Sequence, residues 1–558
     1  MAYDLLIKNG TVIDGTGQAQ RHADVAVSQG KIVEIGKISG EAKRVIDASD
    51  LVVSPGFVDP HSHYDSQICW DTDISPTSWH GVTSVVLGNC GVGIAPCAPA
   101  GREVAIEDVV ALEGIPYDLL KRGITWDWES FPEYMDAAER RGPAINLGFL
   151  APLTPIRQYV MGAAAIERAA TSEETQKIRA LIKDAISAGA LGFSTTVMKQ
   201  HIGHGGKPLA CRLASPEELN SYANVLKELG KGTLQIAVTE RAGALSEGER
   251  DLLETLLKES GGRPITWGAL LDRDDMPTSC QDALRLSESL RRRGVIPQIA
   301  AVPIMREFST QRPFVFASCP TWHPVFNKSK EAQAAYFRDP AFRQGFREDL
   351  KVPRTFSGNW SRVILSDSVN PKLKPLEGMT IEEISRQRGV DGVDALLDIT
   401  LEDNLDCEFT MAYLNCTEER LPDLLNAPNT LIGLADGGAH VDTTCDARYT
   451  TYLLGTWVRE RGIMSLEKAV QKLTAEPADI FGMKDRGRLT VGSVADIVVF
   501  DPATVGCAAR WEKRFDQPGG AKRLVSASYG VEYTFVNGTA AWENNALTGA
   551  RAGRVIRT

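Results

Sequence analysis

Short β-branched runs separated by turn residues open the chain and predict an all-β segment. Four such runs fall within the first 50 residues: Leu5–Ile7, Thr11–Ile13, Val25–Val27 and Ile32–Ile35. Similar runs return near the end: Gly487–Asp501, Tyr533–Gly538 and Arg554–Ile556. Gly and Asp at the breaks supply the turns. We therefore expect residues 1–55 and 483–558 to form one small β-sandwich built from both chain ends.

The pattern between them, residues 56–482, alternates apolar strands with amphipathic helices. Thr171 with Glu174 forms a capping box that predicts a helix ending near Gly189, and Ser215-Pro216 opens another helix. The expected strands include 83–87, 191–195, 233–238, 264–271, 295–300 and 430–434. Repeated βα units over about 400 residues are typical of a TIM-like (β/α)8 barrel. The predicted fold class is therefore α/β.

Residues 305–378 interrupt this rhythm. They hold Trp322, Trp360 and several phenylalanines among clustered charges, without clear periodicity. Long irregular excursions in barrel enzymes are often mobile elements over the active site. We interpret the segment either as a lid over the barrel mouth or as a structural insertion far from the chemistry.

Composition narrows the class of protein. The chain has 558 residues, a net charge of −11 and ten cysteines without a CxxC pair. An acidic chain argues against nucleic acid or an anionic membrane as partner, because phosphate binding needs a basic surface. Scattered cysteines fit a reducing compartment. The first residues lack signal-peptide features, and no apolar run reaches about 18 residues. We expect a cytoplasmic enzyme with a small-molecule substrate, and a homo-oligomer is an open possibility.

A His-x-His pair, His61 and His63, directly follows the apolar run Val52–Val58. Alternate residues of an extended chain point the same way, so both imidazoles can reach one metal ion. The other interpretation is two unrelated surface histidines. Because the whole chain holds only eight histidines, the metal interpretation is favoured.

Three features together carry a family resemblance: the early His-x-His pair, the late Asp436 and the β segments at both ends. The chain resembles the amidohydrolase superfamily. The stretch Gly88-Asn-Cys-Gly-Val-Gly93, which follows a buried strand, resembles the D-aminoacylase branch, the N-acyl-D-amino-acid deacylases, where a cysteine at this point is a metal ligand.

The resemblance implies a metal-dependent hydrolase that cleaves a C–N bond, most simply the amide of an N-acyl amino acid. His61, His63, Cys90 and Asp436 match the metal ligands, and Asp436 also matches the residue that shuttles a proton. The ion is expected to be divalent, Zn²⁺ first among the candidates, with one per chain favoured over two. Alternatively, Cys90 is a buried free thiol and Asp436 a turn aspartate.

The chain departs from the family on the fifth and sixth barrel strands, where the deacylases carry histidines. Thr239 and Trp267 occupy those places. His201, His204 and His440 lie near other strand ends and are candidate substitutes: we assign His201 and His440 catalytic roles and His204 a substrate contact. Arg241 and Arg448 are candidates for binding a substrate carboxylate.

The same scaffold also suits other chemistry. A site without two histidines could open a cyclic amide, imide or lactone, or cleave an activated C–C bond. A third hypothesis is a non-catalytic binding or assembly protein. Retention of a convergent polar set argues against it, because a scaffold has no need of one.

Overall fold

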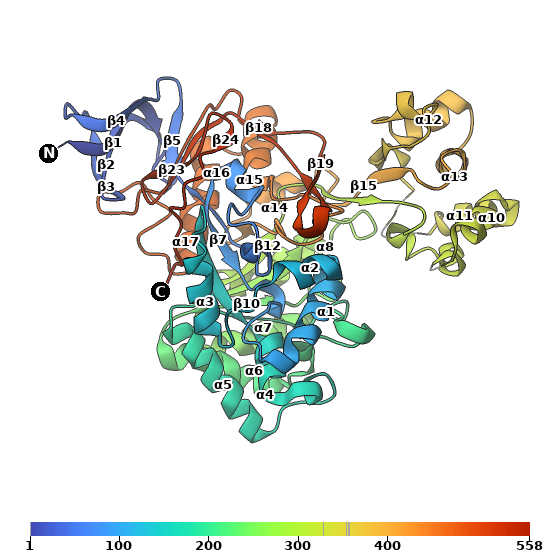
Figure 1. Ribbon diagram of the computed structural model, residues 1–558, viewed down its shortest axis with the longest axis horizontal. Helices are drawn as coiled ribbons and strands as arrows, with labels where there is room; N and C mark the ends of the chain where they lie inside the picture. Colours follow the sequence, from blue (N-terminus) through green and yellow to red (C-terminus); the bar gives the residue numbers. More distant parts are fainter. Residues whose placement is uncertain (1, 327, 353, 355, 357) are drawn as a thin grey trace.

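The computed structural model describes residues 2–326, 328–352, 354, 356 and 358–558, and its centre is a parallel barrel (Figure 1). Eight strands lie side by side in sequence order. They are β6 (Phe57–Asp59), β7 (Val82–Leu87), β8 (Asn146–Pro152), β9 (Gly192–Thr196), β10 (Thr233–Ala237), β11 (Ile265–Leu270), β12 (Val295–Ile299) and β16 (Leu431–Ile432). Just beyond the two edge strands, Ser62 pairs in parallel with Gly437 and joins the first strand to the last. The predicted TIM-like barrel is confirmed.

Helices follow the strands because each buries one apolar face against the sheet. The capping boxes at Thr171 and Ser215 are both formed, and they open α5 and α6 as the sequence predicts. The helices that accompany the barrel are α1 (Arg102–Glu113), α2 (Tyr117–Gly123), α3 (Phe131–Arg140), α4 (Leu153–Met161), α5 (Ser172–Ser187), α6 (Pro216–Leu229), α7 (Glu247–Glu259), α8 (Ser279–Leu286), α9 (Glu288–Arg291), α14 (Leu421–Asn426), α15 (Tyr449–Tyr452), α16 (Leu466–Leu473) and α17 (Ala475–Ile480).

Both chain ends contribute to one nine-stranded sheet, as the sequence predicts. Its strands are β1 (Tyr3–Val12), β2 (Arg21–Ser28), β3 (Lys31–Gly36), β4 (Ala42–Asp47), β5 (Val52–Pro55), β17 (Ile497–Phe500), β22 (Val531–Val536), β23 (Thr539–Glu543) and β24 (Ala546–Leu547). Strand β5 is central: Val53 pairs with Val12 of β1 on one side and with Val499 of β17 on the other. Strand β5 therefore locks the two ends together immediately before the barrel begins.

The interruption after β12 is a separate lobe with its own core. Strands β13 (Ile304–Phe308), β15 (Glu408–Leu414) and β14 (Val363–Asp367) form an antiparallel sheet in that order. Four helices complete the lobe: α10 (Lys330–Arg338), α11 (Pro340–Asp349), α12 (Ile381–Arg388) and α13 (Gly392–Glu402). Phe316, Trp322 and Phe346 pack together in its core. Figure 1 shows these helices well apart from the barrel.

The lobe therefore extends to residue 414, beyond the limit near 378 expected from the sequence. The sequence did not reveal the helices of the lobe. Their aromatic residues pack into a core of the lobe's own and so do not follow the strand–helix pattern of the barrel. Four residues of the expected insertion, 327, 353, 355 and 357, lie outside the described residues. Elsewhere in the described chain, no helix has the length and apolar character needed to cross a bilayer.

Candidate metal centre

His61 and His63 follow β6 at the mouth of the barrel. The buried Asp59 carboxylate shapes this turn by accepting hydrogen bonds from the His61 backbone N–H (3.1 Å) and from the Ser62 hydroxyl (2.6 Å). The His63 N–H donates to the Gly437 carbonyl (2.6 Å), which fixes the segment against the last strand. Both imidazoles are buried, with ring centroids 5.2 Å apart. The two rings thus face one region from a rigid, paired backbone.

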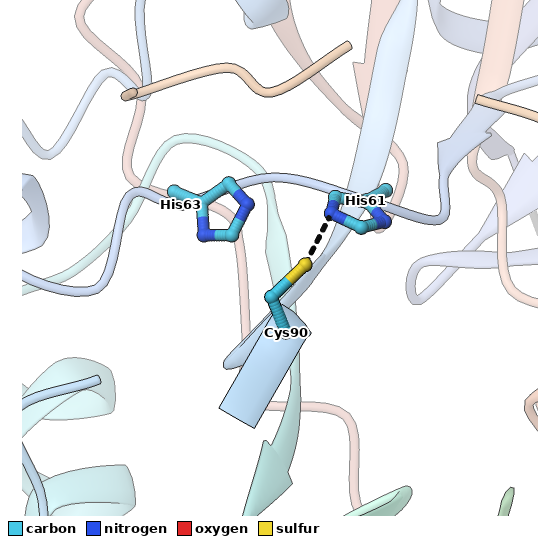
Figure 2. A group of neighbouring side chains, drawn as sticks. All are labelled: His61, His63 and Cys90. Atoms are coloured by element: carbon cyan, nitrogen blue, oxygen red, sulfur yellow. Dashed lines mark hydrogen bonds between the residues drawn. The ribbon is translucent and has the colours of Figure 1, made fainter. Parts of the chain in front are cut away.

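Cys90 approaches the same point from the end of β7 (Figure 2). Its Sγ lies 3.4 Å from His61 Nε2, and the ligand atoms of His61, His63 and Cys90 all lie within 4.8 Å of one another. Gly88 makes this turn possible: its φ is 77°, and a Cβ there would lie 2.1 Å from the Leu150 carbonyl oxygen. Burial raises the pKa of the Cys90 thiol, but His61 and His63 lower it more, so the pKa falls below its ordinary value.

Asp436 completes the group from the segment after β16. Its Oδ1 lies 3.4 Å from His61 Nε2 and 3.7 Å from His63 Nε2. Burial raises the pKa of this carboxyl, but the two histidines hold it well below its usual range. The side chain is 42% exposed, unlike the nearly buried histidines. Asp436 can therefore touch both an ion and a molecule entering from the mouth.

The outer nitrogens of both imidazoles are held by acceptors. His61 Nδ1 donates to Gln298 Oε1, and Gln298 Nε2 donates in turn to Thr266 Oγ1 (3.2 Å). His63 Nδ1 lies 3.4 Å from the buried Glu113 carboxylate. Acceptors at Nδ1 leave Nε2 free for a metal, and metal-binding histidines usually have such partners. Two imidazole nitrogens, one thiolate and one carboxylate form a donor set that suits Zn²⁺.

The Glu113 carboxylate also changes how His63 titrates. Burial alone lowers the pKa of His63, but Glu113 and Asp436 raise it well above its ordinary value. A proton and a metal ion therefore compete for this imidazole, and acid should weaken metal binding.

His201 and His440 lie within electrostatic reach of His63 and Asp436, and burial favours the neutral form of both. Burial lowers the pKa of His201 to about 4 and that of His440 to about 3, with the positive charges of His63 and Arg306 as further causes. His201 Nδ1 is buried and has no hydrogen-bond partner among the described residues. The backbone N–H of His440 donates to the Glu113 carbonyl (2.6 Å). The structure thus brings the two candidate catalytic histidines to the site.

The other three candidates lie elsewhere. His204 turns away, with its Nδ1 bonded to Asp108 (2.9 Å). Arg241 is exposed beyond the end of β10. Arg448 is buried, and its guanidinium donates to the Ala508 carbonyl (3.1 Å) and lies over the Trp511 ring. His204 and Arg448 are thus engaged by other protein groups, and Arg241 lies on the surface.

Thr239 and Trp267 supply no donor to the cluster. The Thr239 hydroxyl accepts from the Ala269 N–H (3.1 Å), and Trp267 is fully buried in the apolar core. The neighbouring strands β10 and β12 contribute side-chain amides that contact the candidate ligands instead. Gln298 holds His61, and Gln235 Oε1 accepts from the Cys90 N–H (2.6 Å). Sequence reasoning missed both glutamines, although each is the one amide side chain in its short barrel strand.

Glu113 and Arg306 were missed as well. Glu113 is the last residue of α1, and Arg306 lies on the lobe strand β13. Neither belongs to a motif, and only the fold brings them to the barrel mouth.

Comparison with known proteins shows which family the chain belongs to. The model of the amidohydrolase family matches residues 44–285 and 365–540. The chain is 28% identical to a D-aminoacylase of Alcaligenes xylosoxydans xylosoxydans, covering 99% of this chain and 97% of that protein. An N-acyl-D-glutamate deacylase of the same organism is also 28% identical, with 99% and 96% covered. A D-aminoacylase crystal structure superposes with a TM-score of 0.66 at 27% identity over the full length of both chains. The family match covers well over half of the sequence, and the chain belongs to the amidohydrolase family.

Proposed function

We propose that this protein is a metal-dependent hydrolase that cleaves the amide C–N bond of an N-acyl amino acid or a related small amide. The observation that carries the proposal is the convergence of four metal donors at the barrel mouth, with the outer nitrogens of both histidines held by Gln298 and Glu113. The mouth formed by the carboxyl ends of the strands is where barrel enzymes place their active sites.

The proposed ligands are His61 Nε2, His63 Nε2, Cys90 Sγ and an Asp436 oxygen. A divalent ion bound there, with Zn²⁺ favoured, would lower the pKa of water toward neutrality and polarise a substrate carbonyl. One ion per chain is proposed, because Thr239 and Trp267 offer no donors for a second site on β10 and β11.

Asp436 is the proposed proton shuttle. Its carboxylate is ionised at neutral pH and partly exposed, so it can accept a proton from the attacking water. The same oxygen then returns the proton to the leaving amide nitrogen. His201 Nδ1 has no hydrogen-bond partner among the described residues, so neutral His201 can hydrogen-bond the substrate or the water. Neutral His440 is a second candidate for such a contact.

The comparisons indicate which substrates to test first. Relatives at 27–28% identity are named D-aminoacylase, N-acyl-D-glutamate deacylase and N-acyl-D-aspartate deacylase. One solved relative, with a TM-score of 0.67, is described by one-metal activation and second-metal attenuation. These names support an acyl amino acid and a single activating ion as the starting hypothesis for this chain.

Metal analysis and a substrate panel test the proposal. Purified protein should contain about one metal ion per chain, as expected of an active-site ion of this kind, and lose activity on chelation. The panel comprises N-acyl D- and L-amino acids, cyclic amides and imides, and lactones. Turnover of the linear amides supports the proposal. Turnover of cyclic substrates alone would assign the site to ring opening, and metal-free protein that turns over nothing would favour a binding role.

A further inference from the structure

A pocket of about 450 Å³ lies beside the amino end of α1, apart from the metal centre. Ala105 of α1 lines one side of it, and Pro155 of α4 and Ala163 line another. Glu113, at the other end of α1, is the residue that faces His63. Between Ala105 and Glu113 the helix advances by about 12 Å along its axis. None of the residues that line the pocket is a candidate metal ligand, so the two sites are separate.

The lining of this pocket carries no charged side chain. Proline, alanine, glycine, valine and isoleucine make up most of it, and the other members are Cys97, Gln158, Tyr159 and His204. Charged residues make up 24% of the whole chain, so the absence of charge from all fourteen lining residues sets the pocket apart. A concave apolar surface with a few polar groups is the common form of a small-molecule site.

His204 is the fixed polar group of this pocket. The buried Asp108 holds it at two points: Asp108 Oδ1 accepts from the His204 backbone N–H (2.7 Å) and lies 2.9 Å from His204 Nδ1. Gln158 Nε2 donates to the other carboxylate oxygen of Asp108 (2.6 Å). Gly203 permits the close approach, because a Cβ there would lie 2.3 Å from Asp108 Oδ1. Helices α1 and α4 together thus hold one imidazole at the wall of the pocket.

The pairing with Asp108 decides which hydrogen bond His204 can offer to a ligand. A carboxylate oxygen accepts, so Nδ1 carries the proton, and Nε2 of the neutral ring is an acceptor. Neither His204 Nε2 nor Gln158 Oε1 has a hydrogen-bond partner among the residues that the structure describes. Tyr159 is already engaged, because its hydroxyl donates to Glu129 (2.9 Å). A ligand that uses the polar groups of this pocket must therefore bring a donor.

We propose that this pocket binds a small uncharged molecule with an aliphatic body and one hydroxyl group. The hydroxyl donates to His204 Nε2, and the carbon chain covers the apolar residues of α1 and α4. An alkyl carboxylate would bring a negative charge to two acceptors, with no lysine or arginine in the lining. An alkylammonium ion would lose its hydration, with no carboxylate in the lining to replace it. The pocket therefore selects an alcohol over either ion.

Calorimetric titration of the full-length protein with 1-hexanol tests the site, with hexanoate and hexylammonium as charged analogues of the same chain. The protein should bind 1-hexanol at least about tenfold more tightly than either ion, because neither ion finds a counter-charge. Ala163 is exposed at the rim, so Ala163→Trp should fill the pocket and abolish binding without disturbing the core. His204→Phe keeps a ring and removes the acceptor, so the dissociation constant should rise by about 3- to 10-fold, the range of one neutral hydrogen bond. Ala169→Trp and His22→Phe, at exposed positions outside the pocket, are the matched controls and should bind as the wild type does.

Several results would overturn this inference. Absence of 1-hexanol binding would remove the site, and equal binding of hexanoate or hexylammonium would refute the selection of an alcohol. Unchanged binding in Ala163→Trp would place the ligand elsewhere, and unchanged binding in a folded His204→Phe would refute the hydroxyl contact. If His204→Phe does not fold, Ala163→Trp decides about the site.

The variant His61→Ala separates this pocket from the metal centre. It should bind 1-hexanol as tightly as the wild type, and a loss of binding would assign the ligand to the metal centre. These measurements follow binding and not turnover, so they hold whether or not the proposed hydrolase activity is found.

Discussion

The two sides of the barrel mouth are built from different chemistry. The side of β6, β7 and the segment after β16 carries charged or metal-seeking groups: His61, His63, Cys90 and Asp436. The opposite side, β10 to β12, carries the neutral amides Gln235 and Gln298. One side is suited to hold an ion, and the other orients the groups that hold it. The contrast teaches that amides on one side of a barrel mouth can orient candidate metal ligands carried by the other side.

Removing donors from the ligand side should have the largest effect. His61→Ala and Asp436→Asn should each lower kcat by at least about 100-fold, the scale of losing one principal catalytic contributor. Steady-state kinetics with metal-saturated protein measures this. His22→Ala, an exposed histidine on β2, is the control and should retain full activity. Near-normal turnover in either site variant would place the chemistry elsewhere.

Glu113→Gln tests how strongly the ligand side depends on its supporting charge. The amide still fills the space but no longer raises the basicity of His63, so metal affinity should fall by about 10- to 100-fold. Competition with a chelator gives the affinity. Glu107→Gln, exposed on the same helix α1, should leave it unchanged. An unaltered affinity in Glu113→Gln would show that the carboxylate does not act through the metal.

His80 is a buried histidine that no carboxylate pairs with among the described residues, so it should respond to pH in the opposite sense to His63. Its Nδ1 contacts the Thr451 hydroxyl, and burial lowers its pKa to about 3. The folded state therefore binds fewer protons than the unfolded state below pH of about 6.5, and stability is lost as pH falls. Between pH 7 and 5 this histidine should cost about 2 kcal/mol of unfolding free energy.

Urea unfolding of the wild-type protein and of His80→Gln at both pH values checks this effect. Glutamine does not titrate, so the variant should lose less stability on acidification by about the same amount. Parallel pH dependence in the two proteins would contradict the assignment of a neutral, buried imidazole.

The amide side should give the smallest effect. Gln298→Leu removes the acceptor from His61 Nδ1 and should lower kcat/KM about tenfold, the low end for an outer partner of a metal ligand. Gln298→Glu keeps an acceptor and should lose less. A loss in Gln298→Leu as large as in His61→Ala would mean that the two sides of the mouth do not differ in role.

The sequence predicted the barrel because apolar strands alternate with helices over a long stretch, and because local capping boxes mark where α5 and α6 begin. It predicted His61 and His63 because an i, i+2 pair constrains direction by local geometry alone. It did not predict the lobe's helices, because their aromatic residues pack into a separate hydrophobic core around Trp322 and show no clear periodicity along the chain. His204 and Arg448 were assigned to substrate by proximity in the chain, and the structure pairs them with Asp108 and the Ala508 carbonyl.

Local chain chemistry by itself determined the class of fold, the paired histidines and, through the family resemblance, the positions of Cys90 and Asp436. Only the tertiary structure decided what surrounds them. Glu113 comes from a helix end and Gln298 from a barrel strand, and 237 residues separate Gln298 from His61, the histidine that it holds. No pattern of spacing in the sequence predicts such contacts, because they depend on how β12 and α1 pack around the barrel mouth.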